Sequence, residues 1–166
     1  MAENMFMLHH RHSMRLQGYD YSQAGSYFIT ICTQERLLLL GPDSARELIE
    51  RWWVTLPSKF PNVDIDTFVV MPNHIHGIFV ILDDDGTAVG PEQNRVTMSS
   101  VVQWYKTMTT NEYIRGVKQL GWPRFNQHLW QRDFWDHIVR NDADLARLRT
   151  YIENNPSLWT KDVLYA

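Results

Sequence analysis

The sequence contains one cysteine, Cys32, and no apolar run long enough to cross a membrane. A single cysteine excludes an internal disulfide and any metal site built from several thiolates. Residues 1–18 hold three histidines but lack the apolar core of a signal peptide. We therefore expect a soluble, cytoplasmic protein that has no membrane partner.

An overall excess of basic charge is also lacking. The formal net charge is −3 at pH 7, which gives no support for nucleic-acid binding by the chain as a whole. The charge is uneven, however, because residues 101–150 hold eight Lys and Arg against five Asp and Glu. This distribution permits a basic face, although ordinary protein surfaces show similar asymmetry.

The length and composition indicate one compact domain. The chain has 166 residues, of which 44% are hydrophobic and 13% aromatic, as in packed globular proteins. Residues 1–24 show no clear periodicity. We predict a single domain over residues 1–166, in which residues 1–24 form an N-terminal arm.

The spacing of apolar residues predicts regular elements in the order β-α-β-β-α-β-α. The predicted strands are residues 27–33, 67–71, 76–82 and 130–135. The predicted helices begin at 42–44, at Ser99 or Ser100, and at Asn141, and they end near Leu56, Ile114 and Pro156. Residues 83–92 are expected to form a surface loop.

This order predicts an α+β, ferredoxin-like fold with an added C-terminal helix. The helices would cover one face of an antiparallel sheet. The other face would remain free for a ligand or a partner.

His74 and His76 are the most specific local feature. Residues two apart on a strand point to the same side, so both imidazoles can bind one ion while Ile75 points into the core. Imidazole binds Mn²⁺ or Zn²⁺ well and Mg²⁺ less well. The alternative is a pair of half-exposed polar side chains, since two histidines alone provide no third ligand.

The residues around this pair resemble the His-hydrophobic-His motif of HUH single-strand endonucleases. They read Val69-Val-Met-Pro-Asn-His-Ile-His-Gly-Ile-Phe79, and they are most similar to REP-associated tyrosine transposases and related small single-tyrosine transposases. The resemblance continues in residues 25–33, 129–141 and 151–156, and covers nearly the whole chain from Gly25 onward. Four matching segments in one order are not expected by chance.

The resemblance implies that Tyr151 is the catalytic nucleophile. A phenolate attacks phosphorus and later leaves readily, so a 5′-phosphotyrosine bond conserves the energy for rejoining. Taken alone, Tyr151 is one of seven tyrosines and could be an ordinary packed helix residue. Tyr105 is the main rival, and the resemblance implies that it is a core residue.

The resemblance also implies that Asn155 is the third metal ligand beside His74 and His76. Asn155 follows Tyr151 by four residues, which places both on one helical face. The cofactor would be a divalent metal, Mg²⁺ or Mn²⁺, that polarises the scissile phosphate. Because Pro156 disfavours helical dihedrals at the residue before it, we expect the Asn155 side chain to deviate from the ideal face.

Residues 130–137 mix aromatic side chains with arginine, a combination that suits single-stranded DNA because bases stack on rings while arginine holds phosphates. An aromatic core strand is the alternative. We expect the aromatic rings to be mainly core and His137 to be structural. The predicted DNA-binding residues are Lys106, Gln131, Arg132 and Arg140.

These features predict a metal-dependent transposase or endonuclease that cleaves and rejoins single-stranded DNA next to a hairpin, of the kind that REP palindromes form. Two alternatives remain open. One is a non-catalytic, ferredoxin-like nucleic-acid-binding module, and the other is a hydrolase in which water attacks the phosphate. Relatives in the resembled family include dimers and monomers, so a homodimer is also open.

Overall fold

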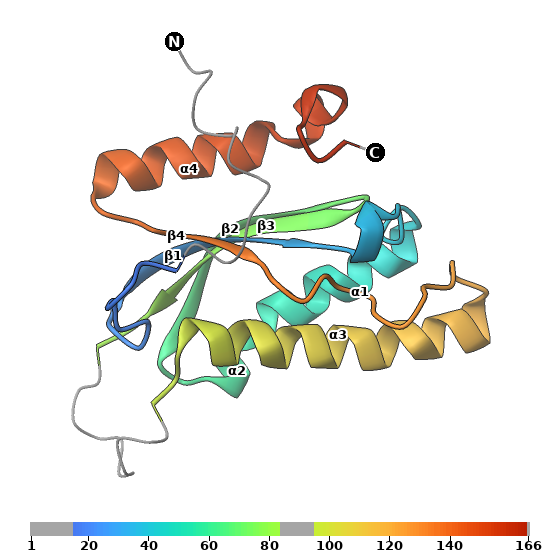
Figure 1. Ribbon diagram of the computed structural model, residues 1–166, viewed down its shortest axis with the longest axis horizontal. Helices are drawn as coiled ribbons and strands as arrows, with labels where there is room; N and C mark the ends of the chain where they lie inside the picture. The colour runs from blue at the N-terminus through green and yellow to red at the C-terminus, as the bar shows by residue number, and fades with distance from the viewer. Residues whose placement is uncertain (1–14, 84–94, 166) are drawn as a thin grey trace.

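The computed structural model describes residues 15–83 and 95–165 and forms an α+β fold around one sheet (Figure 1). The elements in chain order are β1 (Gly25–Cys32), η1 (Gln34–Arg36), α1 (Asp43–Val54), α2 (Leu56–Lys59), β2 (Val63–Met71), β3 (His74–Ile81), α3 (Met98–Leu120), β4 (Trp135–Ile138), α4 (Asp142–Asn154) and η3 (Pro156–Lys161).

The four strands are antiparallel and lie in the order β2-β3-β1-β4. This is the strand order of a split βαβ fold, in which β3 is inserted between β1 and β2 and β1 between β3 and β4. The predicted fold class is therefore confirmed. In the β1–β3 pair, Thr30 lies opposite His76 and Cys32 opposite His74.

The two faces of the sheet bury different sets of side chains. On one face, α1 and α3 cover a large core (Figure 1). On the other face, α4 packs on a smaller cluster of Phe28, Ile78, Leu148 and Ile152. The prediction of a free second face was wrong, because the apolar residues of α4 bury themselves against it.

Successive side chains of β3 point alternately to the two faces of the sheet. Ile75 and Phe79 belong to the large core, while Ile78 belongs to the cluster under α4. His76 stacks on Phe28 of that same cluster, with ring centroids 5.6 Å apart. The period of two residues in a strand thus places both histidines on the side opposite Ile75, as the sequence predicts, and this side is the face that α4 covers.

The second long helix differs from the prediction at both ends. It begins earlier, at Met98, after the N-cap Thr97, which forms a reciprocal capping box with Ser100. It also continues past Ile114 to Leu120 and ends at Gly121 in the left-handed region. Gly116 lies inside the helix and does not end it; its lack of a side chain makes room for the ring of Trp122, which lies 2.1 Å from the position of a Cβ.

The last strand also differs from the prediction. Trp130 forms only an isolated bridge to Thr33, and β4 begins at Trp135. The carbonyls of Gln131 and Arg132 accept hydrogen bonds from Lys106 of α3 instead of entering the sheet.

Parts of two predictions lie outside the described residues, namely the N-terminal arm over 1–14 and the loop over 84–92. Within residues 15–83 and 95–165, no helix is both long and apolar enough to span a membrane.

Candidate active site

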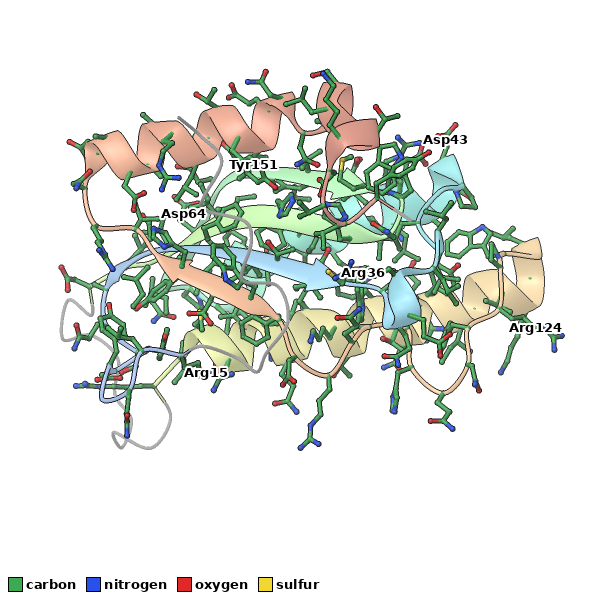
Figure 2. All side chains as sticks on the ribbon, turned by 45° about the horizontal axis from the view of Figure 1, so that its top comes forward. Arg15, Arg36, Asp43, Asp64, Arg124 and Tyr151 are labelled. Atoms are coloured by element: carbon green, nitrogen blue, oxygen red, sulfur yellow. The ribbon has the colours of Figure 1, made fainter. Side chains whose placement is uncertain are left out.

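The structure brings the two predicted histidines and the predicted tyrosine together. His74 and His76 face each other with their Nε2 atoms 3.1 Å apart. Tyr151 extends from α4 toward the sheet (Figure 2), and its hydroxyl lies 3.2 Å from His76 Nε2. The histidine pair of β3 and a tyrosine 75 residues further along the chain therefore meet between β3 and α4.

The other ring nitrogen of each histidine is held by a neighbouring side chain. His74 Nδ1 lies 2.7 Å from Asn73 Oδ1, and His76 Nδ1 lies 2.8 Å from Thr30 Oγ1. Asn73 uses its amide nitrogen to donate to the Leu164 and Arg36 carbonyls, so its oxygen is the acceptor for His74 Nδ1–H. Neutral His74 must then present an Nε2 lone pair toward His76.

The site is almost completely enclosed. His74 and His76 are 0% and 3% exposed. Burial lowers the pKa of His74, although the Asp162 carboxylate acts in the opposite direction. Burial also raises the pKa of Tyr151, and Asp162 adds to that effect. The site therefore favours a neutral imidazole at His74 and a protonated phenol in the absence of a cation.

Asn155 lies at the end of α4 and points into the same region. Its dihedrals are helical, φ −57° and ψ −43°. The predicted displacement of Asn155 from the helical face of Tyr151 by Pro156 therefore does not occur. An interaction with the Asn155 side chain lowers the pKa of Tyr151, against the larger effect of burial. Asn155 is 3% exposed, and its Oδ1 has no hydrogen-bond partner among the described residues.

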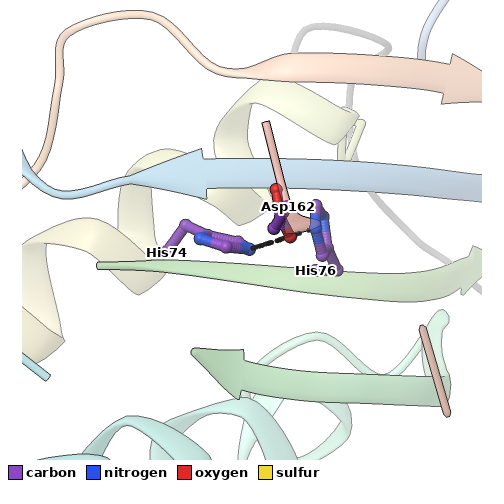
Figure 3. Close-up of side chains that lie close together, drawn as sticks. All are labelled: His74, His76 and Asp162. Carbon is purple, nitrogen blue, oxygen red and sulfur yellow. Dashed lines mark hydrogen bonds and ion pairs between the residues drawn. The ribbon is translucent and has the colours of Figure 1, made fainter. Parts of the chain in front are cut away.

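Asp162 is a component of the site that the sequence analysis missed. It lies just after η3, and its Oδ2 is 3.7 Å from His74 Nε2 (Figure 3). The ligand atoms of His74, His76 and Asp162 all lie within 4.8 Å of one another. No periodic pattern or motif in residues 156–165 distinguishes this aspartate from a surface residue.

These donor atoms fit a divalent cation. Bonds of about 2.0–2.2 Å put neighbouring ligand atoms of one ion about 2.8–3.6 Å apart, and the two Nε2 atoms meet that range. Asn73 and Thr30 hold the Nδ1 atoms, as second-sphere groups of metal-bound histidines commonly do. Asn155 Oδ1 is a buried oxygen available as a further ligand.

Comparison with known proteins identifies the family of this chain. Residues 21–155 match the family model described as "Transposase IS200 like". The chain belongs to this transposase family. Membership of this family implies a DNA-processing enzyme and suggests a divalent metal. The histidine pair and Asp162 form a candidate cluster for that metal.

Individual relatives of this IS200-like transposase support the assignment. The chain is 36% identical over 172 residues to an uncharacterized protein of Haemophilus influenzae, covering 95% of this chain and 94% of that protein. It is 25% identical over 145 residues to the REP-associated tyrosine transposase of Escherichia coli K12, covering 86% and 74%.

A solved structure of a REP-associated tyrosine transposase bound to a REP hairpin has the same fold. It superposes with a TM-score of 0.60 at 24% identity, and the match covers 87% of this chain and 73% of that chain.

Three of the four residues predicted to bind DNA lie together in the transposase. Lys106, Gln131 and Arg132 line a pocket of about 320 Å³ between α3 and residues 127–132. Arg140 lies elsewhere, between β4 and α4, where its backbone N–H donates to Asp144 Oδ2.

Lys106 has a structural contact in addition to its place in this pocket. Its Nζ donates to the Gln131 and Arg132 carbonyls at 2.9 and 3.1 Å and lies 5.3 Å from the centroid of the Phe134 ring. Burial lowers the pKa of Lys106 to about 8. Two of its three N–H donors are therefore engaged by the chain itself.

Proposed function

We propose that the protein cleaves and rejoins single-stranded DNA next to a hairpin, with Tyr151 as the nucleophile and a divalent metal at His74, His76 and Asn155. The observation that carries this proposal is the 3.2 Å distance between the Tyr151 hydroxyl and His76 Nε2. It places the α4 tyrosine directly at the histidine pair of β3 within one chain.

The reaction would exchange one phosphodiester bond for another. The Tyr151 oxygen forms a bond to phosphorus, the bond from phosphorus to the 3′-oxygen breaks, and the phenol proton leaves. The products are a 5′-phosphotyrosine and a free 3′-hydroxyl. Attack by a 3′-hydroxyl on the phosphotyrosine reverses the exchange and restores the phenol without an external energy source.

The chain's own residues would position the groups that react in this exchange. Asn155 interacts with the Tyr151 phenol, and Thr30 and Asn73 would orient the two imidazoles. A divalent metal supplies Lewis-acid polarisation of the scissile phosphate and stabilises the departing oxygen.

His76 Nε2 would serve two partners in turn. When Nδ1 of His76 carries the proton and donates to Thr30 Oγ1, Nε2 has one free lone pair, which can accept from the Tyr151 hydroxyl or bind a cation, but not both. Loading the site would therefore release the phenol from His76 while leaving it next to the pair. Since both histidines are buried, a DNA strand must also displace part of the cover formed by α4 and the segment after it.

DNA binding would use the pocket beside α3. Lys106, Gln131 and Arg132 offer a charged and polar lining there, and Arg140 would contribute from the start of α4. A relative with the same fold is described as bound to a REP hairpin, which supports a hairpin as the substrate. An unpaired flank next to the hairpin would supply the scissile phosphate, because a duplex shields it from in-line attack.

The experiment that tests this proposal uses a hairpin oligonucleotide with a labelled single-stranded flank and Mn²⁺. A transposase gives a cleaved strand and an SDS-resistant protein–DNA adduct of equal amount. Strand cleavage without an adduct would favour attack by water, and binding without either product would favour the non-catalytic module. A fully paired duplex of the same sequence is the control and should give neither product.

A further inference from the structure

We infer that Asp162 is a metal ligand of this chain and that its Oδ2 joins the Nε2 atoms of His74 and His76 in a site of two histidines and one carboxylate. The inference rests on the metal site proposed above and adds a ligand to it. Asp162 lies outside residues 21–155, which match the family model, so the family match does not assign it.

The geometry brings the carboxylate to the histidine pair. Asp162 Oδ2 lies 3.7 Å from His74 Nε2, close to the separation of neighbouring ligands on one ion, and Figure 3 shows both imidazoles next to it. Its other oxygen, Oδ1, is occupied, because it accepts from the Leu164 backbone N–H at 2.7 Å. The carboxylate is thus held so that one oxygen faces the histidines.

The Oδ2 atom of Asp162 is buried without a hydrogen-bond donor in the described part of the chain. The Asp162 side chain is 3% exposed, and Oδ2 has no hydrogen-bond partner among the described residues. A buried carboxylate oxygen without a donor is strongly unfavourable unless a positive charge compensates it. Asn155 Oδ1 is a second buried oxygen without a donor in the same region. A cation bound by His74, His76 and Asp162 would compensate the Asp162 oxygen.

The segment that carries Asp162 is anchored at the site. The buried Leu164 accepts through its carbonyl from Asn73 Nδ2 at 2.7 Å, and the same Asn73 orients His74. Trp159 lies against His74, with ring centroids 5.8 Å apart, and packs edge-on against Tyr165. The Asn73 side chain therefore connects the metal-binding strand to the C-terminal segment.

The donor chemistry points to Mn²⁺ as the probe. Two imidazole nitrogens and one carboxylate oxygen on one side of an ion are typical of sites for divalent first-row metals that keep open positions for a substrate. A charged oxygen also holds a dication more strongly than an amide oxygen does. We therefore expect Asp162 to contribute more to metal affinity than Asn155, and we expect the C-terminal segment to be more ordered when metal is bound.

The test is Mn²⁺ titration of the full chain by calorimetry at fixed pH, for the wild type, Asp162→Asn and Glu153→Gln. Asp162→Asn removes the charge but keeps the shape of the side chain and an oxygen that can accept from the Leu164 N–H. It should weaken Mn²⁺ binding at least about tenfold. That is the lower limit of the loss seen when a residue that only supports a ligand is removed, and loss of a ligand itself should cost no less. Glu153→Gln removes one exposed carboxylate from α4 and should leave the affinity unchanged.

Thermal unfolding separates a ligand from a merely structural residue. Without metal, Asp162→Asn should have a Tm equal to or above that of the wild type, because it removes a buried, uncompensated charge. With saturating Mn²⁺, its gain in Tm should be smaller than that of the wild type. A lower Tm without metal and an undiminished gain with metal would overturn the inference. Asp162→Glu, which retains the charge, should bind Mn²⁺ more tightly than Asp162→Asn.

The adduct assay keeps this inference separate from the proposed function. Equal Mn²⁺ affinity in the wild type and Asp162→Asn, together with normal adduct formation, would overturn the role of Asp162 and leave the proposed function intact. Weakened affinity in Asp162→Asn, with no adduct in the wild type, would support the ligand and overturn the proposed function.

Discussion

Asn73 Oδ1 accepts a hydrogen bond from His74 Nδ1 at 2.7 Å, and both residues are fully buried. The amide nitrogen of Asn73 donates to the Leu164 and Arg36 carbonyls. One side chain thus fixes the tautomer of His74 and connects three segments around it. Thr30 Oγ1 lies 2.8 Å from His76 Nδ1 and orients that ring from the neighbouring strand.

Thr30→Val should weaken Mn²⁺ binding by about 10- to 100-fold, because it removes the hydroxyl that orients His76 and preserves the side-chain shape. Asn73→Ala should have at least this effect. It should also lower the free energy of unfolding by about 1–3 kcal/mol, since the buried Leu164 carbonyl loses its donor. Calorimetric titration and urea unfolding measure the two effects. Thr150→Val on the exposed side of α4 is the control, and an equal loss of affinity there would refute the assigned role of Thr30.

Gly77→Ala should destabilise the fold by about 1–3 kcal/mol, as overpacking of a core does. An added Cβ would lie 2.4 Å from the buried ring of Trp53, which has little room to move. At Gly41 an added Cβ meets only the Leu38 carbonyl oxygen, at 3.3 Å, so Gly41→Ala should cost less. Urea unfolding compares the two variants, and equal losses would argue against tight packing of Gly77 on Trp53.

Arg149→Gln should slightly reduce stability at neutral pH, and the deficit should shrink in acid. The Arg149 side chain donates to Asp66 of β2, and this hydrogen bond lowers the pKa of Asp66 to about 2. Because an unfolded aspartate has a pKa of about 3.9, the contact stabilises fully above that pH and is lost as the pH falls toward 2.

Urea unfolding of the wild type and Arg149→Gln between pH 7 and pH 3 checks this dependence. Lys118→Gln, which neutralises an exposed cation on α3, is the control and should show no such trend. A deficit that stays constant down to pH 3 would show that Arg149 stabilises α4 through something other than Asp66.

Arg132→Gln should weaken hairpin binding and make the slope of log K against log salt shallower by about one unit, as expected for one lost phosphate contact. Lys106→Gln should also lower stability, because its Nζ holds the Gln131 and Arg132 carbonyls. Gel-shift titrations at several salt concentrations and urea unfolding measure these effects. An unchanged slope for both variants would place the DNA elsewhere on the protein.

The sequence was sufficient for the fold class and for the central histidines, because both depend on local patterns. Alternating apolar residues define β1 and β3, and the spacing of His74 and His76 places both on one face of a strand. The contact between Tyr151 and His76 could be expected only from the family resemblance, since it depends on how α4 crosses the sheet.

The remaining parts of the site depend on contacts between distant segments. Thr30 reaches His76 because β1 and β3 pair in one particular register, which no local pattern specifies. Asp162 reaches His74 because residues after Pro156 fold back over the turn at Asn73. Similarly, the contacts of residues 130–132 are made to distant segments: Gln131 N–H donates to the Cys32 carbonyl, while the Gln131 and Arg132 carbonyls accept from Lys106, and β4 begins only at Trp135.

The central claim is that Tyr151 forms the covalent bond to DNA. The most direct measurement is mass-spectrometric mapping of the adduct formed with a hairpin oligonucleotide and Mn²⁺, for the wild type, Tyr151→Phe and Tyr165→Phe. We predict a phosphotyrosine at Tyr151 in the wild type and in Tyr165→Phe, which changes an exposed tyrosine of the same C-terminal segment. Tyr151→Phe should form no adduct but bind the hairpin within about threefold of the wild type, because phosphate contacts dominate affinity. An adduct in Tyr151→Phe, or a modified peptide containing another tyrosine, would contradict the claim.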